Sequence, residues 1–459
     1  MLDRDIIVAL GTPIGEAAIG IVRLSGSGCI ALVEKFFVPK KKGLLLSKVA
    51  SHTVHLGVIC DREGKVLDEV LVNVMRAPRT YTREDVVEVY CHGGIVPVRA
   101  VLRLFLENGA RLAEPGEFTK RAFLNGRIDL AQAEAVLDVI RARTENSALI
   151  AVKNLRGELS EAINRTRATL RSLLIHVEAE IDFPEDVDEM TVEQRLKQLR
   201  GLKKDLEKMI KSFHTGRYYR EGLATAIVGK PNVGKSTLLN LFLGEERAIV
   251  TDIPGTTRDL IEEVVNVHGV PLRLIDTAGI REHVDVVEKI GIERTRRVIQ
   301  DADLVLVLLD AADGLTEEDF QVINMVKGKN VLLVVNKIDS PVRKIDKKIL
   351  HEELSFPVIE ISAKLGWGFE ELKNQIIAMV GNGVVGKESF LVTNFRHFSA
   401  LTKALNSLNE AEKALQLGLP LDCLAVDLWE AWSALGEITG DTVSEEVIEQ
   451  IFKEFCVGK

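Results

Sequence analysis

The chain has 459 residues, which at about 100–200 residues per domain predicts two to four domains. Hydrophobic residues make up 46% of it, and the net charge of −9 excludes a basic field over the whole protein, so any contact with nucleic acid needs a local patch or a partner. Five scattered cysteines without a CxxC pair indicate neither a disulfide framework nor a zinc ribbon. With no signal-peptide pattern and only short apolar runs, we expect a cytoplasmic protein with no membrane span.

Residues 1–119 alternate short β-rich runs with Gly and Pro, and one helical pattern interrupts them at 96–107. This pattern predicts a compact α+β domain. The strand-like runs are residues 6–10, 19–24, 70–75 and 86–90.

Residues 120–216 change to a Gly- and Pro-poor helical composition, broken by an acidic turn at 182–186. Residues 382–459 return to this helical composition from about residue 395. We interpret both segments as one discontinuous all-α domain with another domain inserted between them, since insertions are tolerated where the inserted ends lie close together. Two separate helical units are the alternative.

Residues 217–381 alternate short apolar strands with helices, which predicts a mostly parallel α/β sheet covered on both faces. The predicted strands are residues 224–228, 272–275, 304–309, 331–335 and 358–361.

The first of these strands is followed by residues 229–236, which match the phosphate-binding pattern G-x-x-x-x-G-K-[ST]. Glycines let backbone N–H groups turn toward phosphates, Lys235 brings a cation to the β- and γ-phosphates, and the Ser236 hydroxyl can ligate Mg²⁺. The helix expected after the loop directs its positive dipole end toward the same anion.

Three further motifs end later strands, where open α/β sheets bind ligands. Residues 276–279 read Asp-Thr-Ala-Gly, in which the acid can hold Mg²⁺ through water and Gly279 can meet the γ-phosphate. Asp339, in Asn-Lys-Ile-Asp at 336–339, can accept hydrogen bonds from N1–H and the amine of guanine, which adenine lacks. Ser-Ala-Lys at 362–364 can contact the guanine carbonyl. Four such motifs in order predict a GTPase and disfavour an ATPase.

Residues 249–259 lie between the first two motifs and are predicted to form a nucleotide-sensing switch, in which a Thr adds a second ligand to Mg²⁺. Ile280 occupies the position where many GTPases carry a water-orienting Gln. A polar group must replace it, and the residues alone leave the choice open. A monovalent cation, with Asn232 as a plausible ligand, can supply missing positive charge. The candidate acids are Glu282, Asp285, Glu288 and Glu293.

Across its full length the chain resembles the tRNA-modification GTPase family, MnmE (also called TrmE). The segments that carry the resemblance lie largely outside the nucleotide motifs. No second phosphate-binding loop occurs, because residues 383–389 lack the Ser or Thr after Lys387, and this argues against tandem-domain ribosome-assembly GTPases. The family-like segments are residues 20–26, 81–85, 92–94, 114–125, 129–134, 182–184 and 455–459.

The resemblance implies a homodimer, formed through the N-terminal domain, that works with an FAD-containing partner, MnmG (GidA). Together they install an aminomethyl or carboxymethylaminomethyl group on C5 of the wobble uridine of certain tRNAs. A tetrahydrofolate derivative, the 5-formyl or 5,10-methylene form, donates the one-carbon unit. A regulatory GTPase of ribosome assembly or signalling is the competing hypothesis. The implied folate contacts are Arg23, Glu88, Arg127 and Lys459.

The resemblance also assigns roles around the nucleotide. It gives Glu288 as the water-orienting acid and Arg281 as a contact to the partner half, and these two residues with Lys235 are the predicted catalytic residues. Whether Cys456 is a catalytic thiol or a small hydrophobe stays open. Mg²⁺ falls to Ser236 and Thr257, and K⁺ to Asn232, Thr251, Ile253 (backbone) and Thr256. Motifs and resemblance together predict GTP contacts from Asn232, Val233, Gly234, Lys235, Ser236, Thr237, Thr251, Thr256, Thr257, Asp276, Thr277, Ala278, Gly279, Asn336, Lys337, Asp339, Ser362, Ala363 and Lys364.

Overall fold

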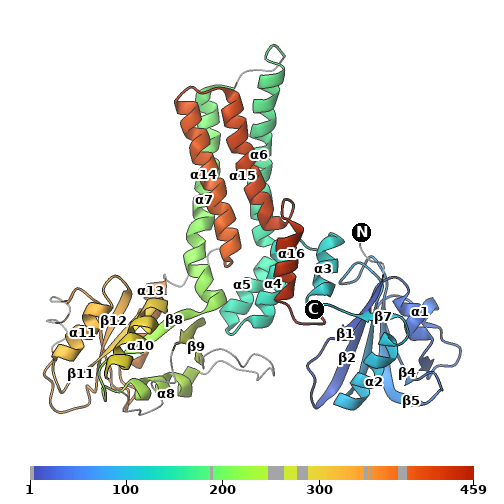
Figure 1. Cartoon of the computed structure of the whole chain (residues 1–459), viewed down its shortest axis with the longest axis horizontal. Helices are drawn as coiled ribbons and strands as arrows, with labels where there is room; N and C mark the ends of the chain where they lie inside the picture. Colours follow the sequence, from blue (N-terminus) through green and yellow to red (C-terminus); the bar gives the residue numbers. More distant parts are fainter. Residues whose placement is uncertain are drawn as a thin grey trace. The chain divides into compact units, whose positions relative to one another are not determined.

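The computed structural model describes residues 5–186, 190–246, 263–275, 288–345, 350, 354–380 and 390–459. The chain divides into two compact units, one made of Met1–Leu137 with Gly436–Lys459 and the other of Asp138–Leu435. Figure 1 labels their elements. Among the described residues, no helix combines the length and apolarity that crossing a membrane requires.

The first unit contains a seven-stranded sheet in the order β3-β4-β5-β6-β2-β1-β7, antiparallel except for the β1–β7 pair. Helix α2 (Ile95–Leu106) packs on this sheet through Val98, Val101, Leu104 and Phe105, whose spacing of three to four residues places them on one face. A shorter helix, α1 (Cys29–Glu34), buries Cys29 and Val33 in the same core. The strands are β1 (Ile6–Leu10), β2 (Ala17–Ser25), β3 (Phe37–Pro39), β4 (Thr53–Cys60), β5 (Val66–Met75), β6 (Val86–Gly93) and β7 (Ala110–Leu112).

The chain's C-terminal end folds as part of this first unit. Phe452 and Phe455 pack against Leu130 and Leu137 in a small apolar cluster. Beyond the cluster, Val457 forms an isolated β-bridge with Pro115. These contacts hold the last residues beside the sheet unit. The helices involved are α3 (Glu117–Leu124), α4 (Leu130–Arg141) and α16 (Glu445–Lys453).

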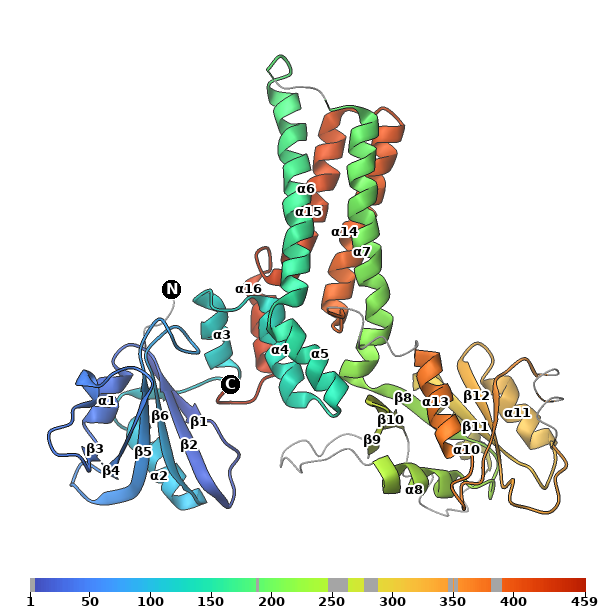
Figure 2. The same ribbon diagram turned by 180° about the vertical axis from the view of Figure 1, so that it is seen from behind.

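The second unit contains the helical bundle, which is built from chain segments on both sides of the nucleotide-binding sequence. Figure 2 shows the long helices α6, α7, α14 and α15 side by side. Helix α7 begins with a capping box, in which Thr191 and Gln194 satisfy each other's backbone N–H groups. The bundle helices are α5 (Glu145–Leu155), α6 (Glu158–Asp182), α7 (Val192–Glu221), α14 (Phe395–Gln416) and α15 (Leu421–Thr439).

Between α7 and α14 the chain forms a six-stranded sheet in the order β13-β12-β11-β8-β10-β9. All neighbouring pairs are parallel except β9–β10. The strands are β8 (Leu223–Val228), β9 (Glu263–Val267), β10 (Val270–Leu274), β11 (Leu304–Asp310), β12 (Asn330–Asn336) and β13 (Val358–Glu360). The helices are α8 (Lys235–Glu246), α10 (Glu288–Asp301), α11 (Glu317–Met325) and α13 (Phe369–Val380).

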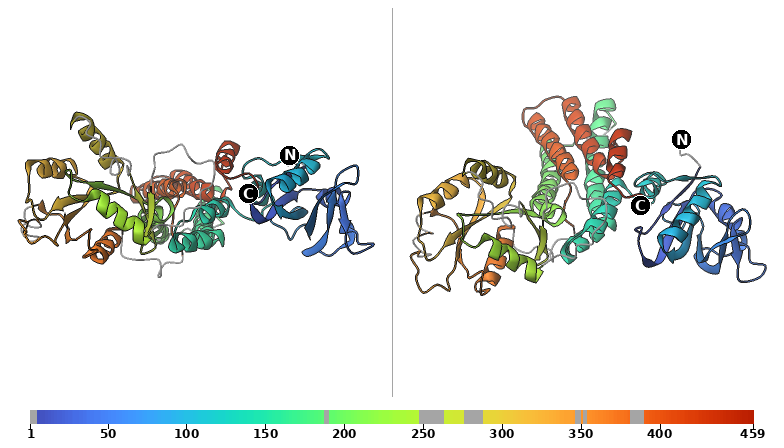
Figure 3. Two further views of the ribbon diagram at one scale, coloured as in Figure 1. Left: turned by 90° about the horizontal axis from the view of Figure 1, so that it is seen from below. Right: turned by 60° about the horizontal axis from the view of Figure 1, so that its bottom comes forward.

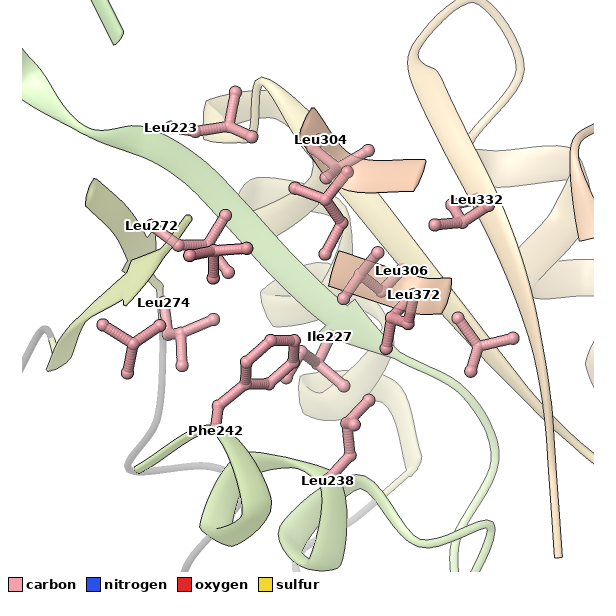
Figure 4. Packing of buried hydrophobic residues seen from close by; sticks show 14 of the residues in the cluster. Leu223, Ile227, Leu238, Phe242, Leu272, Leu274, Leu304, Leu306, Leu332 and Leu372 are labelled. Atoms are coloured by element: carbon pink, nitrogen blue, oxygen red, sulfur yellow. The ribbon is translucent and has the colours of Figure 1, made fainter. Parts of the chain in front are cut away.

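This sheet is buried on both faces, as its continuous apolar strands predict. Along β11, Leu304 and Leu306 point to the face covered by α8 and α13, where Figure 4 shows them with Phe242. Val305 and Val307 point to the opposite face, covered by α10 and α11 (Figure 3). Burying each such side chain stabilises the fold by roughly 2 kcal/mol, so this core fixes the strand ends that carry the site.

The predicted fold class is confirmed: an α+β N-terminal part, an all-α part built from two chain segments, and an inserted α/β P-loop part. The domain bounds of 1–119, 120–216 with 382–459, and 217–381 stay predictions.

Candidate functional site

The phosphate-binding loop connects β8 to α8. Asn232 and Gly234 have φ values of 62° and 102°, the left-handed region that turns successive N–H groups to one side of the loop. A Cβ on Gly234 would clash with the side-chain nitrogen of Asn336, so this position requires glycine for space as well as for φ. Helix α8 begins at Lys235, directly after the loop, and its first N–H groups face the same space. The backbone therefore forms an anion-binding cradle.

Lys235 is folded back over this cradle. Its Nζ donates hydrogen bonds to the carbonyl oxygens of Gly229, at 2.7 Å, and of Lys230, at 2.8 Å. Burial lowers the pKa of Lys235, because a charged amine is poorly solvated there. A phosphate oxygen within reach of Nζ would offset that cost, so the ammonium is placed to bind an anionic ligand in the loop.

Asn336 connects the phosphate loop to the loop after β13. Its side chain is 2% exposed. Its Nδ2 donates to the Val233 carbonyl at 2.8 Å, and its Oδ1 accepts from the Ala363 N–H at 2.9 Å. Each bond satisfies a buried backbone group that would otherwise be unpaired. The structure thus joins two of the motifs expected to form one site.

Asp339 and Ser362 meet at the edge where β12 and β13 end. The Ser362 hydroxyl donates to Asp339 Oδ1 at 2.7 Å. This hydrogen bond holds the pKa of Asp339 below its usual range, and the carboxylate is exposed. An ionised, oriented carboxylate is the acceptor that N1–H and the amine of guanine require.

Two lysines of the site are held by acids that were not among the predicted site residues. Lys337 forms an ion pair with Asp310, Nζ to Oδ2 at 2.6 Å. Burial alone would raise the pKa of Asp310, but the bond from Lys337 brings it below its usual value. In the phosphate loop, Lys230 reaches Asp319 at 3.4 Å and Asp313 at 3.5 Å. An available signal was the run of acids after the strand at 304–309, in which Thr316 and Asp319 form the capping box of α11.

Several predicted site residues fall outside the described residues, so their roles stay predictions. Glu288 begins α10, but its side chain also falls outside the described part. Ser236 and Thr237 lie in the first turn of α8, and Lys364 is exposed after Ala363. The predicted residues outside the described part are Thr251, Ile253, Thr256, Thr257, Asp276, Thr277, Ala278, Gly279 and Arg281.

A second cluster lies on the sheet of the first unit. Arg23 on β2 donates from Nε to Glu88 on β6 at 2.8 Å, and these residues face each other in register. Tyr90 donates to the other oxygen of Glu88 at 2.8 Å. The C-terminal end joins them, since Arg23 Nη1 donates to the Gly458 carbonyl at 3.3 Å. A Cβ on Gly458, which has a φ of 96°, would clash with the Leu10 carbonyl, so only glycine lets the backbone approach so closely.

The remaining predicted folate contacts lie in the same unit. The Arg127 guanidinium stacks on the Tyr81 ring at 4.7 Å. The Lys459 carbonyl accepts from the Phe118 N–H at 3.2 Å, and the Phe118 ring lies 5.8 Å from the Arg23 guanidinium. Cys456 is exposed. The structure thus joins Arg23 and Glu88 to the C-terminal end, through contacts by Tyr90 and Gly458 that sequence reasoning missed.

Comparisons with known proteins match the chain along its whole length. Residues 6–127 match the model "GTP-binding protein TrmE N-terminus", and residues 130–456 match "MnmE helical domain". The "tRNA modification GTPase MnmE" of Alkaliphilus oremlandii is 50% identical over 99% of both chains. The protein of that name from Desulforamulus reducens is 49% identical over 100% of both, and that from Bacillus subtilis is 48% identical over 99% of this chain and 100% of its own.

The phosphate loop, the carboxylate of Asp339 and the parallel sheet that positions them define a GTP-binding P-loop protein. Its relatives are named GTPases, and the chain is a GTP-hydrolysing enzyme. The similarity extends to all parts of the chain, and the chain belongs to the tRNA modification GTPase MnmE family.

Proposed function

We propose that this chain uses GTP hydrolysis in the modification of C5 of the wobble uridine of certain tRNAs. It acts in the cytoplasm as a homodimer with an MnmG-type FAD protein, and the product carries an aminomethyl or carboxymethylaminomethyl group. The observation that carries the proposal is 50% identity to a tRNA modification GTPase over 99% of the chain, which includes both clusters described above.

The cluster around Arg23 fits a tetrahydrofolate derivative by its donor set. A folate has a pteridine, which an acid can bind through its N–H groups, and carboxylates, which cations bind. Glu88 supplies a carboxylate already fixed by Arg23 and Tyr90, and Arg23 and Arg127 supply cations in the same unit. When bound, the folate supplies the one-carbon unit. The chain's residues bind and orient it.

At the nucleotide site, Lys235 exchanges its loop carbonyls for phosphate oxygens, and Asp339 accepts from the guanine. Ser236, in the first turn of α8, is placed to ligate Mg²⁺, with Thr257 as the second protein ligand. Asn232, whose backbone is already turned into the left-handed region, is one of the proposed K⁺ ligands. Thr251, Ile253 and Thr256 complete that set.

We also propose that hydrolysis, with Glu288 orienting the water, closes the GTPase domains of the dimer and does not itself transfer the alkyl group. A Glu288→Ala variant should bind GTP, hydrolyse it at least 100-fold more slowly, and fail to support modification. Full modification by that variant would overturn the coupling. Replacing KCl by NaCl should lower the hydrolysis rate of the wild type, and equal rates would remove the role of K⁺.

The proposed function is tested by reconstitution. Purified chain, its FAD partner, unmodified tRNA, GTP and folate are combined, and tRNA nucleosides are measured by mass spectrometry. The variant Arg23→Ala should abolish the product and folate binding while preserving GTP hydrolysis. Arg103→Ala is the matched control, because Arg103 also pairs with a glutamate, Glu107, but both side chains are exposed on α2. An Arg23→Ala variant that binds folate as tightly as the wild type would contradict the assignment of the folate site. A wild-type protein that modifies no tRNA would favour a regulatory GTPase.

A further inference from the structure

Helix α7 of the bundle concentrates positive charge in a chain whose net charge is −9. It carries nine Lys and Arg against four Asp and Glu. Five of the nine cations form ion pairs with carboxylates of other elements. These pairs are Arg195 with Glu180, Arg200 and Lys203 with Glu412, Arg217 with Asp303, and Arg220 with Asp138.

The other four cations, Lys197, Lys204, Lys208 and Lys211, are exposed and form no ion pair within the described part of the chain. We call them the lysine stripe. At about 100° per residue, their positions fall within an arc of about 60° around the helix. At 1.5 Å per residue, they extend along about 21 Å of its length. Glu193 lies at the edge of this arc, one turn before Lys197, whereas Asp205 and Glu207 lie outside it. This face of the helix therefore carries four lysines against one carboxylate.

A glycine lies on the same face, four residues after Lys197 and three before Lys204. Gly201 is exposed, and a Cβ added to it would meet nothing within 4 Å. Glycine inside a helix costs about 1 kcal/mol relative to alanine. The other glycine of α7, Gly216, is required by packing, since its Cβ would clash with the Val392 carbonyl. Packing gives no such reason for Gly201, and its bare backbone lets a ligand approach the helix closely between two lysines.

The stripe borders a groove of about 370 Å³ between α6 and α7. Lys208 lines it from α7, and Arg165 lines it from α6. Both are exposed, and Arg165 hydrogen-bonds a backbone carbonyl of its own helix, that of Glu161, while Asp205 adds one negative charge. The groove thus extends the positive surface from one helix to the next.

We propose that the lysine stripe of α7 binds the phosphate backbone of tRNA, an inference that rests on the proposed tRNA-modifying function. A line of cations about 21 Å long matches a chain of evenly charged phosphates better than it matches a single small anion. A membrane surface fits less well, because Glu193 and Gly201 are the residues beside the lysines on this face, where an inserting helix would carry apolar side chains. Such contacts position the RNA and carry no base specificity.

The test is the salt dependence of tRNA binding by the full chain. The logarithm of the binding constant falls with the logarithm of salt concentration by about 0.7–0.9 per phosphate contact. The triple variant K204Q/K208Q/K211Q should therefore lower the slope by about 2–3, and weaken binding at 0.15 M salt roughly 10- to 100-fold. Replacement by arginine, K204R/K208R/K211R, should preserve both values. GTP hydrolysis and melting temperature should match the wild type in both variants.

The matched control is K40Q/K41Q/K42Q, which removes three exposed lysines from the first unit and changes net charge equally. An equal loss of tRNA affinity in the control and in the glutamine variant of the stripe would overturn the proposal. A glutamine variant that binds tRNA normally but no longer binds the FAD partner would also overturn it. Gly201→Gln should keep the helix folded and weaken tRNA binding several-fold, and unchanged binding would contradict the close approach. Wild type that binds no tRNA would overturn this inference and the proposed function together, whereas normal binding by the glutamine variant overturns the stripe alone.

Discussion

Replacing Asn336 by alanine removes the side chain that holds two loops of the nucleotide site in place. Both of its hydrogen bonds go to buried backbone groups, the Val233 carbonyl at 2.8 Å and the Ala363 N–H at 2.9 Å. Alanine can make neither bond, and the 2% exposure of Asn336 leaves water little access to the groups it would abandon. Two backbone groups would lose their partners in one substitution.

Leaving a buried polar group unpaired costs about 1–3 kcal/mol, so the loss of both partners should lower the free energy of unfolding by about 2–6 kcal/mol. Both loops lie in the nucleotide site, so GTP affinity should fall as well. A loss of 1.4 kcal/mol from binding corresponds to a factor of ten, and we expect a decrease of at least that factor.

The assays are urea unfolding of the nucleotide-free chain and a fluorescent GTP-analogue titration. Asn374→Ala is the control, because Asn374 is exposed on α13 and the same atoms are removed there without buried partners. It should change the unfolding free energy by less than about 0.5 kcal/mol. An Asn336→Ala variant that matches Asn374→Ala in both assays would refute the reasoning.

Three further substitutions test other parts of the structure. Gly234→Ala should weaken GTP binding at least tenfold in the same titration, because its Cβ clashes with Asn336 Nδ2 at a φ of 102°. Asp339→Asn should reduce selectivity for GTP over ATP by about 100-fold in competition binding, because an amide replaces the charged acceptor. The melting temperature should change little, because Asp339 is exposed. Burial alone would raise the pKa of Glu117, but hydrogen bonds from Arg111 hold that pKa below its usual value. The Glu117 carboxylate therefore stabilises the fold above about pH 4, and this stabilisation is lost as pH falls through the lowered pKa. Glu117→Gln should therefore lower the melting temperature at pH 7 and flatten its decline in acid, and an unchanged acid profile would contradict this.

Much of the fold follows from apolar periodicity in the sequence. The predicted strand at 6–10 coincides with β1, and the helix predicted at 96–107 lies within one residue of α2. Strand β4 was missed because His55 and Gly57 interrupt its apolar alternation. Strand β9 was also missed, although it pairs with β10 across a two-residue turn in which His268 and Gly269 both have positive φ, a local hairpin signal.

The site was predictable where a motif fixes backbone chemistry. The phosphate loop and Asp339 are where their motifs predict, at the ends of strands. The contact between Arg23 and Gly458 joins residues 435 positions apart, and only the folded chain brings them together. Likewise, the pairing of Lys230 with Asp319 depends on how α11 packs beside the loop, which no local pattern specifies.

The central claim is that this chain is needed for C5 modification of wobble uridines. Its most direct test is mass spectrometry of tRNA nucleosides from cells that lack the chain, complemented by wild type, Arg23→Ala or Arg103→Ala. We expect the C5-modified wobble uridines to vanish on deletion, to return with wild type and Arg103→Ala, and to stay absent with Arg23→Ala. Unchanged modified nucleosides in the deletion strain would contradict the account and leave a GTPase whose substrate must be sought elsewhere.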